Sequence, residues 1–285
     1  MQAAVHPPEV TDLIDRLGAA RHPFVLTGAG VSTESGIPDY RARDGRWKRG
    51  APIQYREFTR SAMARRRYWA RSFKGWPQVA GAAPNGAHHA LARLEAAGRI
   101  GWLVTQNVDG LHQRAGSRQV TDLHGRLDRV VCMECGLRRW RDEMQEALHA
   151  LNPDWMSRTA ATAPDGDVEL EGADYAAFRV PDCPACGGVL KPEVVFFGES
   201  VPASVVAIAF ERLDRSDALL VAGSSLMVWS GYRFVRHAAR RGIPVLVVNL
   251  GETRGDREAD LKVDASCGPV LETLADLWSG TGARA

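Results

Sequence analysis

The chain has 285 residues, of which 45% are hydrophobic. This length is enough for one large domain with a smaller satellite module. The formal net charge is only +2, so we expect no general electrostatic attraction to nucleic acid or to a membrane. The composition therefore favours a globular protein over a nucleic-acid-binding tail or a membrane protein.

The sequence predicts a cytoplasmic protein. It contains no run of 18 apolar residues, so no transmembrane helix is expected. The N-terminal segment carries Glu9 and Asp12 and has no arginine before Arg16. This pattern is typical of neither a secretory signal nor an arginine-rich transit peptide.

Apolar strands alternate with helical patterns along most of the chain. Residues 9–20 predict an amphipathic helix, residues 24–26 a buried strand that ends in a glycine turn, and residues 84–98 a second helix. Further strands are expected over 100–104, 218–222 and 245–248, and further helices over 203–214 and 230–241. This alternation predicts an α/β fold with a Rossmann-like, doubly wound parallel sheet, whose ligands bind at the carboxyl edge of the strands.

Two segments interrupt the alternation. Residues 47–83 are rich in Arg, Trp and Pro and predict a small helical insertion. Residues 128–190 contain most of the cysteines and predict a second module. Within that module, the stretch 159–178 has five acidic residues and no basic residue, which is typical of an exposed or partly disordered loop.

Four of the five cysteines form two C-x-x-C pairs, Cys132 with Cys135 and Cys183 with Cys186. Two such turns place four thiolates around a tetrahedral Zn²⁺, which leaves no position for water or substrate, so the predicted zinc is structural. Buried or redox-active thiols are the alternative. A zinc ribbon also suits nucleic-acid binding, but the acidic loop between the pairs argues against that partner.

The glycine turn Gly28-Ala29-Gly30-Val31-Ser32 follows the first strand and suits the close approach of a pyrophosphate. Thr33 replaces the third glycine of the dinucleotide pattern, and Lys48 stands where a dehydrogenase offers an acid to the ribose. Hydride transfer is therefore poorly supported. By itself, the turn is equally compatible with a tight strand-to-helix connection.

Further blocks make the pattern more specific, and with them the chain resembles the sirtuin family from about residue 10 to 275. The blocks are Glu34 to Arg41, Thr105 to His112, Asp122 to Gly125, Lys191 to Glu199, Gly223 to Leu226 and Asn249 to Gly251. Four further motifs resemble the class II branch of the family, which includes a mitochondrial member in animals. They are Arg67 to Arg71, Gly75 to Pro77, Ala163 to Val168 and Trp229 to Phe234.

The resemblance implies an NAD-dependent protein-lysine deacylase that transfers the acyl group to ADP-ribose and releases nicotinamide. In such enzymes the amide oxygen of the acyl-lysine attacks the ribose carbon that bears nicotinamide, and a ribose hydroxyl then loses a proton. His124 matches the catalytic histidine, and a histidine pKa near 6.5 suits that proton transfer. A buried histidine with satisfied hydrogen bonds is the alternative for His124. His88 is expected to cap or pack a helix.

The resemblance also assigns the remaining site residues. Asn107 and Asp109 are expected to join His124 in catalysis by orienting the nicotinamide ribose and a water. Asp39 and Arg41 lie on a loop that folds over NAD, or form a surface ion pair. Cys267 lies near the adenine, or is a small buried hydrophobe. The full set implied for NAD is Gly28, Ala29, Gly30, Ser32, Asp39, Tyr40, Arg41, Gln106, Asn107, Val108, Asp109, Gly223, Ser224, Ser225, Asn249, Leu250, Gly251 and Cys267.

Two segments are predicted to bind the acyl-lysine protein. Val194, Val195, Phe196, Phe197, Gly198 and Glu199 are expected to present an extended edge to the substrate peptide, as well as forming a core strand. Tyr68 and Arg71 are three residues apart, so they share a helix face. Their spacing resembles a pair that binds acidic acyl groups, and a solvated face is the alternative.

The chain is thus expected to be one sirtuin-type catalytic domain over 1–285. Its NAD-binding lobe comprises 10–46, 84–127 and 191–280, with the helical insertion at 47–83 and the zinc module at 128–190. A protein mono-ADP-ribosyltransferase is the alternative enzyme. A non-catalytic NAD sensor is less consistent with the presence of His124, Asn107 and Asp109 together.

Overall fold

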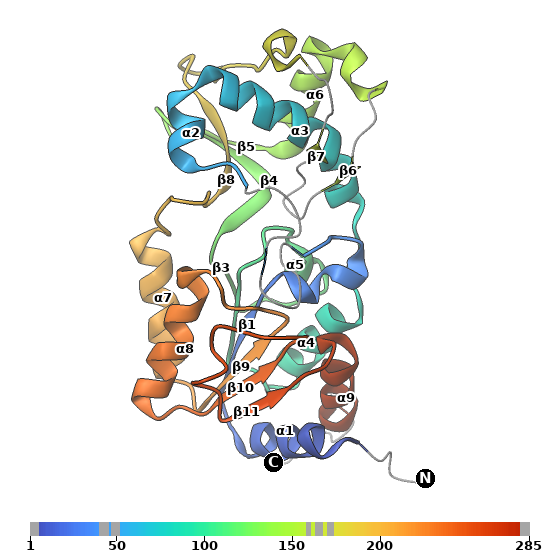
Figure 1. Cartoon of the computed structure of the whole chain (residues 1–285), viewed down its shortest axis with the longest axis vertical. Helices are drawn as coiled ribbons and strands as arrows, with labels where there is room; N and C mark the ends of the chain where they lie inside the picture. The colour runs from blue at the N-terminus through green and yellow to red at the C-terminus, as the bar shows by residue number, and fades with distance from the viewer. Residues whose placement is uncertain are drawn as a thin grey trace.

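The computed structural model describes residues 6–39, 46, 52–157, 161–162, 168–169 and 174–279. Figure 1 shows a larger part, which contains the first and the last of the described helices, and a smaller part above it. The larger part is built on a six-stranded sheet in the order β11-β10-β9-β1-β2-β3, in which every neighbouring pair is parallel. Its strands are β1 (Pro23–Thr27), β2 (Trp102–Thr105), β3 (Val120–Asp122), β9 (Ala218–Ala222), β10 (Val245–Val248) and β11 (Leu261–Val263).

Both faces of this sheet are covered by helices. Alternate strand residues point to opposite faces: Val25 packs into one core, whereas Phe24 and Leu26 pack into the other. The first core includes α1 (Pro8–Ala19), α4 (Gly86–Ala96) and α9 (Cys267–Ser279), and the second includes α7 (Ala203–Asp214) and α8 (Trp229–Arg241). The predicted doubly wound parallel sheet is therefore confirmed.

The elements predicted from apolar patterns all form, with bounds that differ by at most two residues. Of the strands and helices of the larger part named above, three had no prediction: β3, β11 and α9. The first two have only three residues each, which is too short for a periodic pattern. Helix α9 begins with Cys267-Gly268-Pro269, a turn-like sequence in which proline is tolerated because the first helical turn needs no internal N–H bond.

The smaller part is built on an antiparallel sheet in the order β5-β4-β8, covered by helices. The strands are β4 (Gly125–Cys132), β5 (Arg138–Trp140) and β8 (Leu190–Val194), and the helices are α2 (Tyr55–Arg60), α3 (Ala62–Gly81) and α6 (Arg141–Leu151). Helices α2 and α3 confirm the predicted helical insertion, although residues 47–51 lie outside the described residues. The domain boundaries given above stay a prediction.

A buried arginine joins α3 to α6 in the smaller part. The Arg141 side chain is 1% exposed, and its guanidinium carbon lies 5.3 Å from the ring centroid of Trp69 and 5.2 Å from that of Trp76. Its Nη2 donates to the carbonyl and hydroxyl oxygens of Ser72, both at 3.3 Å. Burial lowers the pKa of Arg141 to about 10. Two tryptophan faces thus replace much of the water around this cation.

The remaining elements are short: α5 (Leu111–Arg114), η1 (Ala29–Val31), η2 (Thr33–Ser35), η3 (Pro153–Ser157) and η4 (Tyr175–Ala177). The predicted acidic loop over 159–178 lies mostly outside the described residues. Its described part includes an antiparallel pair, β6 (Ala161–Thr162) with β7 (Val168–Glu169), which the sequence pattern did not predict. None of the helices in the described part of the chain combines the length and apolar character needed to span a bilayer.

Candidate active site

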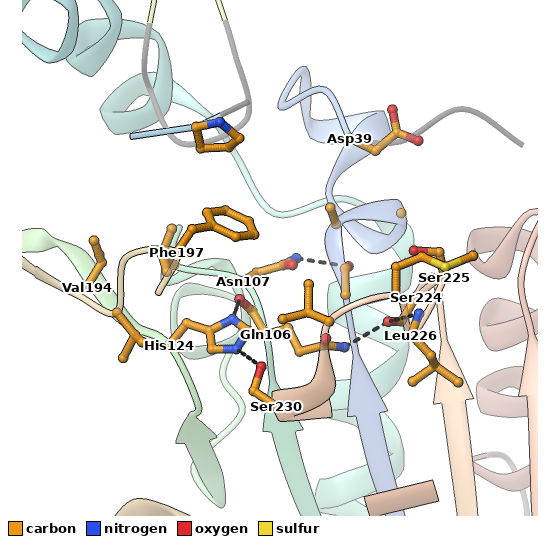
Figure 2. Close-up of a pocket in the computed structure, with 18 of the residues that line it drawn as sticks. Asp39, Gln106, Asn107, His124, Val194, Phe197, Ser224, Ser225, Leu226 and Ser230 are labelled. Atoms are coloured by element: carbon orange, nitrogen blue, oxygen red, sulfur yellow. Dashed lines mark hydrogen bonds between the residues drawn. The ribbon is translucent and has the colours of Figure 1, made fainter. Parts of the chain in front are cut away.

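The loops after four parallel strands meet at one edge of the larger sheet. Thr27 of β1 pairs in register with Thr105 of β2 and Ala222 of β9, and Ala222 pairs with Val248 of β10. The residues that follow these strand ends therefore start at the same level. They surround a cavity of about 980 Å³ (Figure 2). This volume is at the upper end of the range for small-molecule sites.

Most of the residues predicted for the site line this cavity. They are Gly28, Ala29, Gly30, Ser32, Asp39, Tyr68, Gln106, Asn107, Val108, Asp109, His124, Val194 to Glu199, Gly223, Ser224, Ser225, Asn249 and Leu250. Three predicted residues, Arg71, Gly251 and Cys267, are not among the lining residues. Tyr40 and Arg41 lie outside the described residues.

The glycine turn after β1 packs main chain to main chain against the turn after β9. The Gly30 N–H donates to the Gly223 carbonyl oxygen at 2.8 Å. A Cβ on Gly30 would lie 2.9 Å from the Gly223 Cα, and one on Gly28 would lie 2.7 Å from the Ser224 Cβ. Gly223 itself has a φ of +60°, and its Cβ would meet the Val31 nitrogen at 2.6 Å. The two turns can approach this closely because they carry glycines.

Ser32 holds the two polar residues that follow β2. Its hydroxyl donates to Asp109 Oδ2 at 2.7 Å and accepts from Asn107 Nδ2 at 2.9 Å. Asn107 Nδ2 also donates to the Gly28 carbonyl oxygen at 3.0 Å, which orients the amide. Burial raises the pKa of Asp109, while hydrogen bonds from the Leu111 N–H and the Ser32 hydroxyl oppose that rise.

His124 is held by a hydrogen bond at each ring nitrogen. Nδ1 lies 2.8 Å from the Gln106 carbonyl oxygen, and Nε2 lies 2.7 Å from Ser230 Oγ (Figure 2). A carbonyl oxygen can only accept, so Nδ1 carries the proton and Nε2 is left as the basic nitrogen. Burial lowers the pKa of His124, and the charge of Arg233 lowers it further. The imidazole is therefore neutral near pH 7.

Two features of this site had no prediction from the sequence. Ser230, the partner of His124, is 8% exposed and lies at the start of α8. The run Trp229 to Phe234 indicated family membership but gave no role to this hydroxyl. Leu226 has a φ of +57°, an uncommon left-handed backbone for a branched side chain, and its side chain is buried at 1% exposure.

Cys267 and His88 are buried and do not line the cavity. Cys267 Sγ is 3.7 Å from the Gly30 carbonyl oxygen, and burial raises the pKa of this thiol to about 11. This environment matches a small buried hydrophobe. His88 completes the capping box of α4 with Asn85, as predicted. Its ring also lies 4.8 Å from that of His112, and both rings are nearly inaccessible to solvent.

Known proteins are similar to this chain in sequence and in fold. The model of the Sir2 family matches residues 28–230. An NAD-dependent protein deacetylase 2 from Bradyrhizobium diazoefficiens is 58% identical over 257 residues, which are 90% of this chain and 94% of that protein. The mitochondrial NAD-dependent protein lipoamidase sirtuin-4 from Bos taurus is 48% identical over 271 residues, 94% of this chain and 86% of that protein.

The chain belongs to the Sir2 family, the sirtuins. A solved Sir2 structure with a p53 peptide and NAD⁺ superimposes with a TM-score of 0.75 at 30% identity, covering 94% of this chain and 98% of that one. A second Sir2 enzyme structure gives a TM-score of 0.75 at 32% identity, with 95% and 98% covered. The family expected from the sequence motifs is thereby confirmed, and the 48% match agrees with the class II branch.

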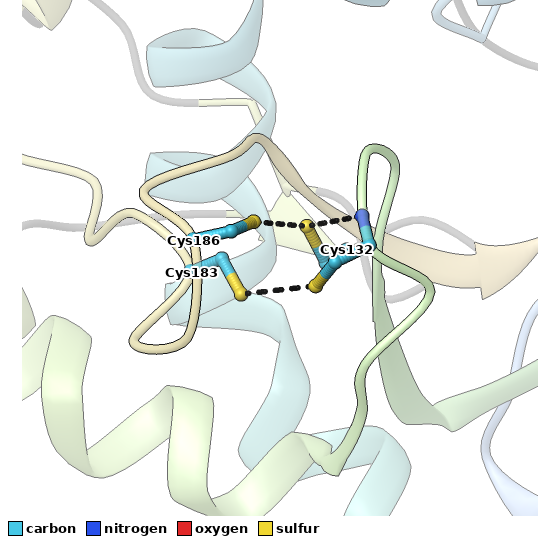
Figure 3. Close-up of side chains that lie close together, drawn as sticks. Cys132, Cys183 and Cys186 are labelled. Atoms are coloured by element: carbon cyan, nitrogen blue, oxygen red, sulfur yellow. Dashed lines mark hydrogen bonds between the residues drawn. The ribbon is translucent and has the colours of Figure 1, made fainter.

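The smaller part of this sirtuin carries the four paired cysteines (Figure 3). Their four Sγ atoms all lie within 4.8 Å of one another. Cys132 Sγ is 3.5 Å from Cys186 Sγ, and Cys135 Sγ is 3.7 Å from Cys183 Sγ. Four sulfurs around Zn²⁺ at about 2.3 Å are separated by roughly 3.8 Å, so these positions fit the ion. All four cysteines are free of disulfide bonds, which leaves each thiolate available to the metal.

Zinc removal should destabilise this sirtuin. Cys183→Ala removes one of four ligands, so we expect a loss of bound zinc and a lower melting temperature, because metal binding is coupled to folding of such modules. Elemental analysis of protein purified without chelator should give one Zn²⁺ per chain. Cys267→Ala is the matched control, since it removes a buried thiol outside the cluster and should leave the zinc content unchanged. Wild-type protein without zinc would contradict the assignment.

Proposed function

We propose that this sirtuin is an NAD-dependent protein deacetylase in which His124 is the general base and a broader range of acyl groups can be removed from lysine. The observation that carries the proposal is the neutral, half-buried His124, which has Nε2 as its basic nitrogen and lines the same cavity as the glycine turns. The relatives named above, a bacterial deacetylase and a lipoamidase, support the reaction class, because both names describe NAD-dependent removal of an acyl group from protein.

The glycine turns fit NAD. A pyrophosphate needs main-chain N–H groups without side chains in front of them, and Cβ atoms on Gly28 or Gly30 would fill that space. Ser225 lines the same region, and its hydroxyl has no hydrogen-bond partner in the described part of the chain. Asn249 and Leu250 follow β10 at the adenosine end. Bound NAD supplies a ribose carbon from which nicotinamide can leave.

Asn107 and Asp109 act as orienting residues next to the reacting carbon. Because Nδ2 of Asn107 is occupied by Gly28 and Ser32, its Oδ1 is left to accept a hydrogen bond from the ribose or a water. Asp109 Oδ1 accepts a hydrogen bond from the Leu111 N–H, and Oδ2 accepts one from the Ser32 hydroxyl. Both side chains are therefore fixed before a ligand arrives, and such preorganisation lowers the cost of reaching the reactive geometry.

His124 takes the proton of the ribose hydroxyl. The Gln106 carbonyl oxygen fixes the ring and the tautomer, so the lone pair stays on Nε2. Ser230 Oγ, at 2.7 Å, already donates to this lone pair. The substrate hydroxyl must therefore displace the Ser230 proton or pass its own proton through Ser230 to His124.

The acyl-lysine protein is placed along the segment Val194 to Glu199, which continues β8. The main chain is extended only at the start of this segment, and it then turns: the Glu199 N–H donates to the Phe196 carbonyl oxygen at 3.0 Å, and Gly198 has a φ of +78°. Val195 N–H already donates to the His124 carbonyl oxygen at 2.8 Å, which ties the segment to the catalytic residue. Gly198 N–H and Met227 N–H both belong to residues that line the cavity, and they donate no hydrogen bond to the described residues. They are available to the backbone of an inserted peptide strand, and a p53 peptide is present in one of the similar Sir2 structures.

Loss of the base should stop deacylation. His124→Ala removes the proton acceptor, so kcat should fall by roughly 10²–10⁴ while the fold is kept. The assay is mass spectrometry of an acetyl-lysine peptide with NAD, and the exposed His22→Ala is the matched control. O-acyl-ADP-ribose in the wild-type reaction supports deacylation. ADP-ribose added to protein without deacylation would instead favour the mono-ADP-ribosyltransferase. Near wild-type turnover by His124→Ala would contradict the role of this residue.

The pH dependence should report the environment of His124. The neutral ring is the active form, and burial lowers its pKa, so kcat/KM should fall on the acidic side with a midpoint below the ordinary value of 6.5. The Ser230 hydroxyl donates to the neutral ring and so favours it. Ser230→Ala should therefore move the acidic midpoint upward, toward 6.5. An unchanged midpoint in this variant would exclude a role for Ser230 in tuning the base.

Two arginines, Arg71 and Arg233, are candidates for binding the carboxylate of an acidic acyl group. Tyr68 lines the cavity, as the acidic-pocket hypothesis requires, whereas its helix neighbour Arg71 is not among the lining residues. Arg233 does line the cavity, and its buried Nε has no hydrogen-bond partner in the described residues. A guanidinium with a vacant donor is suited to the carboxylate of an acyl chain such as glutaryl.

Substitutions can show which of the two arginines binds the acyl carboxylate. If Arg71 binds the acyl carboxylate, Arg71→Met should lower kcat/KM for glutaryl-lysine by roughly tenfold and leave acetyl-lysine turnover nearly unchanged. Arg233→Gln is the parallel variant, and a selective loss there assigns the carboxylate to Arg233. An equal loss on both substrates in both variants would mean that these arginines are structural and that there is no acidic acyl pocket.

The cytoplasmic location and the domain division belong to the same proposal. A reducing compartment keeps the four paired cysteines as thiols, ready to bind a metal rather than to form disulfides.

The proposed NAD-binding lobe over 10–46, 84–127 and 191–280 supplies the glycine turns, and the segments 47–83 and 128–190 supply Tyr68 and the cysteines. The substrate segment 194–199 lies where these parts meet.

A further inference from the structure

A second cavity of about 570 Å³ adjoins the catalytic cavity. Its walls are α2 and the segment after β8, and its lining residues are Tyr55, Arg56, Thr59, Arg60, Gly198, Glu199 and Ser200. The last three residues also line the catalytic cavity. A peptide that runs along Val194 to Glu199 therefore passes from one cavity to the other.

Arg56 and Arg60 give the second cavity a positive charge that no other described residue neutralises. They are four residues apart on α2, so their side chains share a face. Both are exposed, and neither side chain makes a hydrogen bond or an ion pair within the described residues. By contrast, Arg67 on α3 pairs with Glu57, at 2.5 Å. Two guanidiniums are thus left to the cavity.

The one carboxylate that lines this cavity is already engaged. Glu199 Oε2 lies 3.0 Å from Lys191 Nζ and accepts from the Phe196 N–H at 2.8 Å. Lys191 is 5% exposed, so this ion pair is largely shielded from water. Its two charges offset each other, and the net field in the second cavity comes from Arg56 and Arg60.

Helix α2 is fixed against the substrate segment. The Tyr55 N–H donates to the Phe197 carbonyl oxygen at 2.8 Å. Phe58 is fully buried, and its ring centroid lies 5.2 Å from that of Phe196. The backbone that carries the two arginines is therefore positioned by packing, which reduces the ordering cost of binding a ligand there.

We propose that Arg56 and Arg60 form a subsite for an acidic side chain, aspartate or glutamate, of the substrate protein. The proposal rests on the function proposed above, in which the substrate strand follows Val194 to Glu199. A guanidinium binds a carboxylate through two parallel N–H donors. Ser200 lies five residues after Val195, and the turn between Phe196 and Glu199 makes this span shorter than five strand residues of about 3.3 Å each. The acidic residue is therefore within roughly five positions of the acylated lysine.

The test uses acetyl-lysine peptides with NAD and full-length enzyme. The reference peptide has uncharged flanks, and each other peptide carries one glutamate at a position up to about five residues from the lysine on either side. One or two neighbouring positions should raise kcat/KM about three- to tenfold at low salt, mainly through KM, and high salt should abolish the gain. Arg56→Gln with Arg60→Gln should abolish it too, without changing turnover of the reference peptide.

The matched control is Arg240→Gln, an exposed arginine at the end of α8, which should keep the preference for glutamate. Thermal unfolding of each variant checks that the fold is intact. A wild-type enzyme with no preferred position, or a preference that survives in the double variant, would overturn the subsite. Failure of the wild type to process the reference peptide would count against the proposed function instead.

Discussion

The contact between two glycine turns determines the shape of the catalytic cavity. The Gly30 N–H bonds to the Gly223 carbonyl oxygen at 2.8 Å, and side chains on either turn would collide with main-chain atoms of the other. This contact joins the ends of β1 and β9 in the middle of the sheet. Ser32 follows the first turn and organises Asn107 and Asp109. Backbone packing at one point therefore sets the positions of polar groups from three different strands.

The cavity also depends on the smaller part of the molecule. Tyr68 lines the cavity from α3, and α3 is held to α6 by Arg141 between Trp69 and Trp76. Helix α6 follows directly from β5, which pairs with β4 beside the cysteine cluster. The proposed zinc thus supports the wall of the acyl-lysine site through packed side chains, although it lies apart from the reacting atoms.

Much of this arrangement could be predicted from the sequence, because its signals are local. The apolar runs before Gly28, Gln106 and Gly223 predict strands, and parallel strands bring their following residues to one edge. The cysteine spacing predicts a metal cluster for a similar reason, since each C-x-x-C turn is complete in itself. The structure agrees with both, and the family matches explain why the blocks occur in this order.

The features without a prediction depend on contacts between distant residues. Ser230 meets His124 across 106 positions of the chain, and no local pattern indicates such a partner. The cavity beside Arg56 and Arg60 has walls from α2 and from the segment after β8, far along the chain, and the Tyr55–Phe197 hydrogen bond joins them. Short elements such as β11 were missed because three residues carry no periodicity.

The buried arginine between two indoles has a consequence for how this protein can evolve. Replacing Arg141 alone leaves a gap between the rings and removes the donor to the Ser72 hydroxyl, whereas replacing one tryptophan alone leaves a desolvated cation without its cover. Each single step is costly, so the three residues can change only together. We therefore expect lineages to keep all of Trp69, Trp76 and Arg141 or none, which makes the trio a marker of common descent independent of the catalytic residues.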